Sequence, residues 1–107
     1  MSTTLEELTK LVMEQAKEKG FGTTLKEISV PEKIALIHSQ ISSAYEGYRK
    51  NKLTGEWSLE NELAGAVIII IQLYAVMDLD FEKSLLHKIE EIKGRKWGWE
   101  KLNQNHS

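Results

Sequence analysis

The chain has 107 residues, of which 41% are hydrophobic and 28% are charged, and it has a net charge of −2 and no cysteine. This length suits a single domain (residues 1–107), and this balance is typical of an ordered soluble protein, which excludes a disordered chain. The small negative charge gives no basic field for nucleic acid, and the lack of cysteine excludes disulfides and thiolate metal sites. No secretory signal opens the sequence, so we expect a cytoplasmic protein.

The first two predicted helices each begin at a capping-box pattern. Thr4 and Glu7 have this spacing, and an apolar stripe follows over residues 5–16 until Gly20 ends the helix. Residues 21–28 are expected to form a loop. Ser29 repeats the pattern with Glu32 and begins a second helix. The apolar stripe of this helix consists of Ile34, Ile37, Ile41, Ala44, Tyr45 and Tyr48.

The run Val-Ile-Ile-Ile-Ile at residues 67–71 allows two interpretations. Its β-branched residues suit a strand, but no other segment alternates with period two, so a strand would leave its backbone unpaired. The surrounding apolar run, residues 63–77, contains Gln72 and falls short of the roughly 18 residues of a membrane span. We therefore predict a helix from Ser58 to Met77. Because it is apolar on every side, we predict an oligomer in which these central helices pack together.

The last helix is predicted after a break at residues 78–80, where Asp80 is its expected cap, and it ends near Gly94. The chain is therefore predicted to be all-α, with four main helices. Trp97 and Trp99 follow, and we expect them to pack in the core or at an interface more readily than to stack on a base. Residues 98–107 are expected to form a flexible tail.

Four segments of the chain carry a pattern that spans most of its length. They are residues 16–21 (AKEKGF), 32–49 (EKIALIHSQISSAYEGYR), 62–68 (ELAGAVI) and 88–95 (KIEEIKGR). In this order they resemble the MazG-like nucleotide pyrophosphohydrolases, which belong to the all-α NTP pyrophosphohydrolase superfamily. The resemblance implies a four-helix MazG-like bundle completed by oligomerisation, as a homodimer or homotetramer. It also implies Mg²⁺-dependent cleavage of a nucleoside triphosphate to a monophosphate and pyrophosphate.

The resemblance also implies where the metal ligands fall. Members of the family bind magnesium through an ExxE pair on one helix and an ExxD pair on the next, and acids three apart point the same way from a helix. In this sequence the first pair falls at Gln40 and Ser43, and the second falls at Glu62 and Gly65. Three of the four acids are therefore absent. Glu62 is retained, and Glu46 matches a common acidic position one turn beyond the first pair, so these two are the candidate metal ligands.

Lys88, Lys93 and Arg95 are the candidate nucleotide-binding residues. The family commonly has an asparagine, then a basic residue, and an arginine two positions further on. Here Ile92 stands in place of the asparagine, while Lys93 and Arg95 are retained. Lysine and arginine suit phosphate groups, although cations near a helix C-terminus also stabilise the helix itself.

Three functions fit this pattern. The first is a nucleotide pyrophosphohydrolase with an altered metal site, in which Mg²⁺ on Glu62 and Glu46 assists attack of water on a phosphate. The second is a catalytically silent relative that still binds nucleotide, and the third is a structural or partner-binding helical oligomer. Because a neutral amide and a hydroxyl do not offset a 2+ charge, we expect Mg²⁺ affinity to be much reduced. No partnership with nucleic acid or membrane is expected, and the catalytic residue and the preferred nucleotide stay open.

Overall fold

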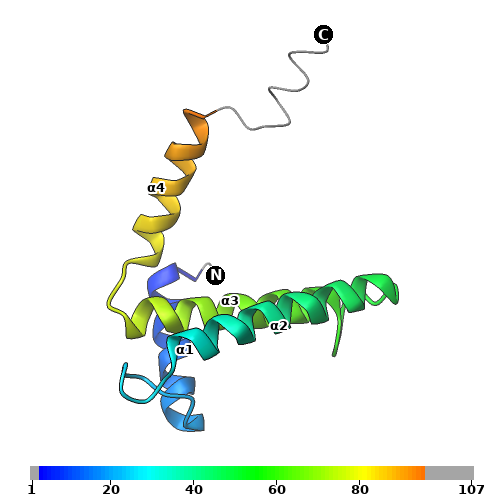
Figure 1. The fold of residues 1–107 in the computed structure, drawn as a ribbon, viewed down its shortest axis with the longest axis horizontal. Coiled ribbons are helices and arrows are strands. Elements are labelled where there is room, and N and C mark those ends of the chain that lie inside the picture. Colours follow the sequence, from blue (N-terminus) through cyan, green and yellow to red (C-terminus); the bar gives the residue numbers. More distant parts are fainter. Residues whose placement is uncertain (1–2, 96–107) are drawn as a thin grey trace.

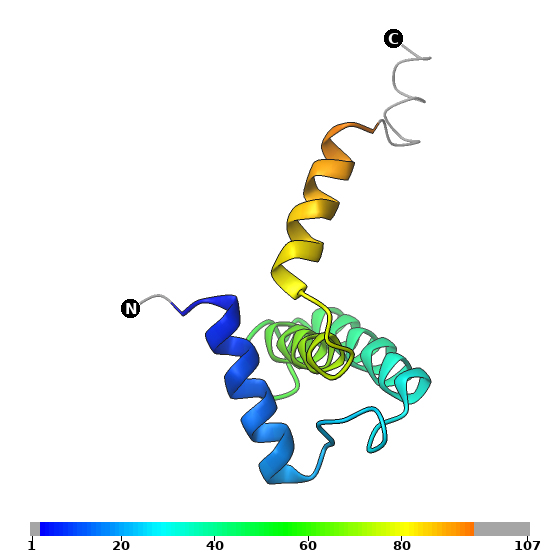
Figure 2. The ribbon, with the colours of Figure 1, turned by 90° about the vertical axis from the view of Figure 1, so that its left-hand side faces the viewer.

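A computed structural model describes residues 3–95. Its four helices are α1 (Leu5–Lys19), α2 (Val30–Arg49), α3 (Leu59–Val76) and α4 (Phe81–Lys93). No strand occurs between residues 3 and 95, so the prediction of an all-α chain is confirmed. α2 and α3 lie side by side, α1 crosses them near one end, and α4 projects from that same end (Figures 1 and 2). Trp97, Trp99 and the expected tail lie outside the described residues.

The helices begin at the predicted caps. Thr4 accepts a hydrogen bond from the Glu7 amide at 3.1 Å, and the Glu7 carboxylate accepts from the Thr4 amide at 3.4 Å, which completes the capping box. At the start of α2, Ser29 accepts from the Glu32 amide at 3.3 Å, and the return bond is not found in the described part of the chain. The caps of α3 and α4 are Ser58 and Asp80.

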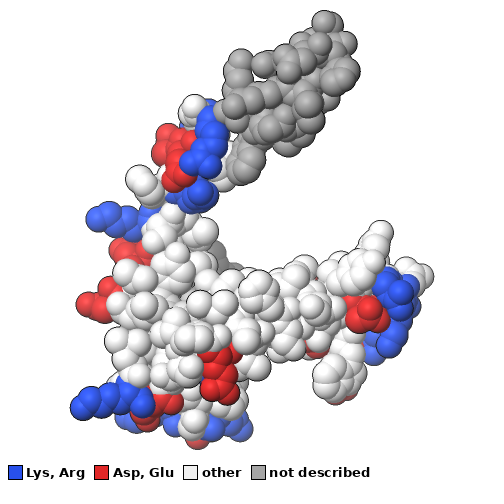
Figure 3. All heavy atoms as spheres, in the orientation of Figure 1, with Lys and Arg blue, Asp and Glu red and all other residues white. Residues whose placement is uncertain are grey.

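The core between the helices is built mainly from small side chains. Its buried hydrophobic residues are Ala16, Ala44, Ala66 and Ile71. The larger residues of the predicted stripes are much less covered. Six of them expose between 43% and 61% of their surface: Ile34, Ile41, Tyr45, Tyr48, Leu63 and Val67. The face of the α2–α3 pair that is visible in Figure 3 carries few charged groups. A single chain therefore forms the predicted stripes and leaves much of their apolar surface in solvent.

Gln72 anchors the loop between α1 and α2 to the middle of α3. Its side chain is buried, and Nε2 donates to the carbonyl oxygens of Phe21 at 3.1 Å and Gly22 at 2.9 Å. Gly22 has φ +96°, and a Cβ there would collide with Ile28, so this turn requires glycine. The one amide in the apolar run thus fixes a loop that is 50 residues away in sequence.

Helix α3 is, among residues 3–95, the one helix long and apolar enough to cross a membrane. The apolar run itself is shorter than a span, but the whole helix has 18 residues. One such helix is weak evidence for a membrane, because the central helix of a soluble protein meets the same criteria. Glu62 and Gln72 are both buried against other parts of this chain, which is consistent with a soluble protein.

Candidate functional site

The end of α2 and the start of α3 meet backbone to backbone at Gly47. A Cβ built on Gly47 would lie 2.7 Å from the Leu59 nitrogen and 2.9 Å from the Ser58 carbonyl carbon. Both Gly47 and Ser58 are buried, and Ser58 is fully enclosed. Because real Cβ contacts are longer than this, only glycine permits the observed separation of the two helices. This contact holds α2 and α3 together beside the site described below.

The loop over residues 51–57 is bonded to both helices. The Lys52 amide donates to the Gly47 carbonyl at 2.8 Å. In return, the Leu59 amide donates to the Lys52 carbonyl at 3.0 Å, and the Glu60 amide donates to the Leu53 carbonyl at 3.1 Å. The first amides of a helix usually lack backbone partners, and here two of them are paired with this loop. These hydrogen bonds hold the loop in place, and the loop forms one side of the pocket described next.

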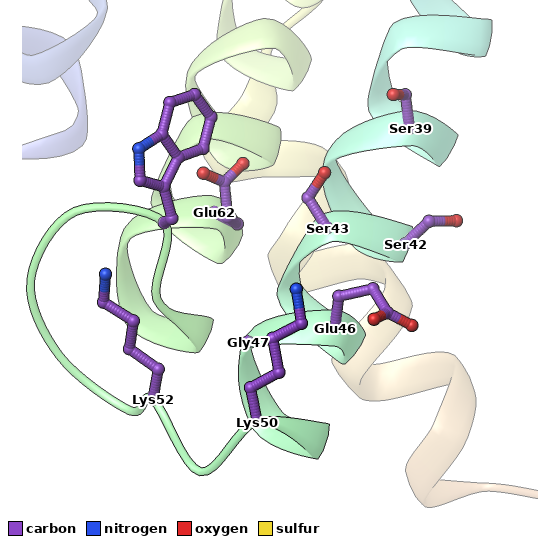
Figure 4. Close-up of a pocket in the computed structure, with 9 residues that line it drawn as sticks. Ser39, Ser42, Ser43, Glu46, Gly47, Lys50, Lys52 and Glu62 are labelled. Carbon is purple, nitrogen blue, oxygen red and sulfur yellow. The ribbon is translucent and has the colours of Figure 1, made fainter.

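A pocket of about 550 Å³ opens between this loop, the end of α2 and the start of α3 (Figure 4). Its lining combines hydroxyl, carboxylate, ammonium and indole groups. The lining residues are Ser39, Ser42, Ser43, Glu46, Gly47, Lys50, Lys52, Trp57 and Glu62. Its volume lies within the range of small-molecule sites, although its lining is more polar than is usual for them.

The four positions that the resemblance assigns to metal ligands meet beside this pocket. Ser43 on α2 and Glu62 on α3 both line it. In the amide orientation that satisfies its neighbours, Gln40 donates from Nε2 to Glu62 Oε2 at 2.7 Å and to the Glu62 carbonyl at 3.3 Å. A Cβ on Gly65 would lie 2.6 Å from the end of the Gln40 side chain. Gln40, Ser43, Glu62 and Gly65 therefore converge where α2 packs on α3.

The two candidate metal ligands differ in their surroundings. Glu62 is buried, with 8% of its surface exposed, and its carboxylate accepts the hydrogen bond from Gln40. Glu46 is exposed and forms an ion pair with Arg49, whose Nε lies 3.3 Å from Glu46 Oε1. Within residues 3–95 there is no group of three or more histidine, aspartate and glutamate side chains suited to a metal ion. A magnesium ion prefers about six oxygen ligands in octahedral geometry, so this donor set does not fit the magnesium that the resemblance implies.

The predicted nucleotide-binding residues lie away from the pocket in a single chain. Lys88 and Lys93 belong to α4, and Arg95 follows it; α4 leaves the α2–α3 pair at the end opposite the pocket (Figure 1). Lys88 donates to Glu91 at 3.2 Å, and Arg95 contacts the same carboxylate, so both cations lower the pKa of Glu91. Lys93 lies 3.5 Å from Glu90 in the same way. The structure thus pairs these cations with glutamates of their own helix.

Lys50, Lys52 and Trp57 are the charged and aromatic residues of the pocket that were not among the predicted site residues. They lie in or beside the segment that the sequence indicates only as a connection between helices. One signal was present, because two lysines and a tryptophan within eight positions form an unusual composition for a plain turn. Their convergence on one pocket depends on the fold of the loop, which the composition does not specify.

Comparisons with protein-family models, with curated proteins and with solved structures find no match for this chain. The assignment to a family therefore stays a prediction from the four sequence segments.

Proposed function

We propose that this chain is a MazG-like protein whose α2–α3 pocket binds a nucleoside phosphate and has lost most or all of the magnesium-dependent hydrolysis. The observation that carries the proposal is the 2.7 Å hydrogen bond from Gln40 to Glu62. This bond joins the one retained acid of the motif to a position where the family has another acid.

The charge at this contact explains the expected loss of hydrolysis. Two carboxylates 2.7 Å apart would repel each other strongly, and a bound cation would be needed to hold them together. With glutamine at position 40, a neutral amide satisfies Glu62 without any cation. Ser43 and Gly65 contribute no charge either, so little at this point attracts a divalent ion. The pocket beside it still offers hydroxyls, ammonium groups and an aromatic ring.

The test of this proposal is to restore the missing acids in the variant Gln40→Glu, Ser43→Glu, Gly65→Asp. We expect the natural chain to bind nucleoside triphosphates, detected by a rise in melting temperature, and to release little or no pyrophosphate with Mg²⁺. The triple variant is expected to gain Mg²⁺ binding in calorimetry. A control with the same charge change and no new carboxylate, Lys10→Gln, Lys19→Gln, Lys83→Gln at exposed positions, should not gain it. A folded triple variant that ignores both metal and nucleotide would contradict the proposal.

A working pyrophosphohydrolase is the second candidate. The observation that favours it is that Glu46 and Glu62 line the same pocket, so further acids supplied by a second subunit would complete a metal site. Rapid magnesium-dependent release of pyrophosphate by the natural chain would establish this candidate over the first. A chain that neither hydrolyses nor is stabilised by any nucleotide would instead be a structural or partner-binding oligomer.

We also propose that the chain associates with itself as a homodimer or homotetramer. α4 has only 13 residues and packs on the rest of the chain mainly near its start, where Phe81 lies edge-on to Tyr74 at 4.9 Å. A helix this short is marginal in water unless its apolar face is covered. Its exposed apolar residues are Leu85, Leu86, Ile89 and Ile92. The exposed apolar stripes of α2 and α3 in a second copy of the chain are a surface on which α4 could pack.

A further inference from the structure

We infer that the pocket holds the phosphate groups of its ligand through Lys50 and Lys52, without magnesium. This inference rests on the proposed function. In it, the two lysine ammonium groups supply the positive charge in place of the metal. The ligand class is a diphosphate or triphosphate ester that carries a planar ring. The inference comes from the charges, the backbone and the aromatic residue of the pocket.

The acidic and basic side chains of the pocket differ in the partners that they have within the chain. Its lining contains two carboxylates and two ammonium groups. Glu62 accepts a hydrogen bond from Gln40, and Glu46 is paired with Arg49. Within residues 3–95, Lys50 and Lys52 have no carboxylate within 4.0 Å. The two ammonium groups therefore lack an ion-pair partner, and an anion complements them.

The backbone around these lysines is fixed before any ligand arrives. Lys50 is the C-terminal cap of α2, and its amide donates to the carbonyl of Glu46. Lys52 is held through both its amide and its carbonyl, which bond to Gly47 and Leu59. Figure 4 shows the Lys50 side chain beside the end of α2 and the Lys52 side chain within the curve of the loop, and both line the pocket. A phosphate in the pocket would meet two cations whose backbone is fixed, with the Ser43 hydroxyl on α2 as a further donor.

Trp57 indicates the other part of the ligand. Its indole lines the pocket with 68% of the residue exposed, so this side chain contributes little to the core. Its backbone has φ +61°, a left-handed conformation that costs a bulky residue of order 1 kcal/mol and that glycine adopts freely. A strained, exposed tryptophan at the edge of a polar pocket is suited to stack on a planar ring. A nucleobase next to the phosphates fits this arrangement.

The sign of the magnesium effect distinguishes this site from a carboxylate–metal site. In a carboxylate–metal site, Mg²⁺ bridges protein acids and phosphates, so it tightens nucleotide binding. At a lysine site, Mg²⁺ bound to the triphosphate neutralises the charge that the lysines recognise, so it weakens binding. The two mechanisms therefore predict opposite changes in affinity when EDTA is replaced by Mg²⁺.

The experiment is calorimetry of the full chain with a panel of the common ribonucleoside and deoxyribonucleoside triphosphates and with inorganic triphosphate, first in EDTA and then in excess Mg²⁺. We expect binding in EDTA, weaker binding in Mg²⁺, and a loss of roughly tenfold or more in affinity for Lys50→Gln, Lys52→Gln. The control Lys10→Gln, Lys83→Gln removes the same charge from exposed lysines on α1 and α4 and should bind as the natural chain does. Circular dichroism checks that both variants are folded.

The other outcomes separate the two proposals. Nucleotide binding that requires Mg²⁺, or that survives the loss of both pocket lysines, overturns the lysine site and leaves the proposed function standing. Lysine-dependent binding of inorganic triphosphate in EDTA, with no nucleotide bound, supports the anion site and contradicts the nucleotide function. No binding of any probe in either buffer overturns both.

Discussion

The α2–α3 pair and α4 differ in how completely a single chain supports them. At the pocket end of the pair, Gly47 brings the two backbones together, and the loop over residues 51–57 is bonded to both helices. α4 extends from the opposite end (Figure 1), and its apolar residues Leu85, Leu86, Ile89 and Ile92 are exposed. The pocket is formed by a single chain, and the exposure of α4 supports the proposal that this helix packs on a second copy. Binding and assembly are therefore separable by mutation.

The largest effect is expected from charging the apolar face of α4. In the double substitution Leu85→Glu, Ile89→Glu we expect the proposed homo-oligomer to dissociate, because burying each such side chain contributes about 1.5–3 kcal/mol. The change is measured as molar mass by light scattering after gel filtration. The matched control Lys83→Gln, His87→Glu changes the net charge equally on the other side of the helix. If the double variant kept the mass of the natural protein, α4 would not be the interface.

A series of glycine substitutions tests how much the close contact between α2 and α3 contributes to stability. Gly47→Ala forces a Cβ into the backbone of Ser58 and Leu59 and should destabilise the chain by roughly 2–3 kcal/mol in urea unfolding. Gly65→Ala meets only the flexible end of Gln40 and should cost less. Gly94→Ala makes an ordinary contact, 4.0 Å from the Glu91 carbonyl oxygen, and should change stability by under about 0.5 kcal/mol. Equal costs at positions 47 and 94 would show that the close helix contact is not required.

Substitution of Gln72, on α3, is expected to have an intermediate effect on stability. Gln72→Leu removes two hydrogen bonds and leaves the carbonyls of Phe21 and Gly22 without this donor, so we expect a loss of about 2 kcal/mol. The control Gln15→Leu, at an exposed position of α1, should be close to neutral. Unfolding followed by circular dichroism gives both values. A neutral Gln72→Leu would mean that the loop is held by other contacts.

The smallest effect concerns the strained residue of the pocket. Trp57→Gly relieves a left-handed backbone but gains entropy in the unfolded chain, so we expect a net stabilisation of only about 0.5 kcal/mol. Asn51→Gly is the control, because asparagine tolerates its φ of +58° and should gain nothing. The melting temperature should rise for the first variant even as nucleotide binding weakens. Destabilisation of the Trp57 variant would show that the indole is part of the core.

Features that depend on residues close together in the sequence could be predicted, whereas features that depend on contacts between distant residues could not. Caps and helix ends depend on neighbouring residues, so Thr4, Ser58 and Asp80 could be assigned correctly. The meeting of Gln40 with Glu62 depends on how two helices pack, and the sequence suggested it only through a resemblance. The pocket lysines depend on a loop with left-handed residues and bonds to both helices. Neither composition nor periodicity encodes that path, and for this reason Lys50, Lys52 and Trp57 were missed.

The paired amides at the start of α3 have a consequence for motion. Amide protons in the first turn of a helix usually exchange with solvent fast, because they have no hydrogen-bond partner within the helix. Here the amides of Leu59, Glu60 and Asn61 donate to Lys52, Leu53 and Ser58. Fraying of α3 should therefore begin at its C-terminal end, and deuterium should replace the amide protons of its first turn late.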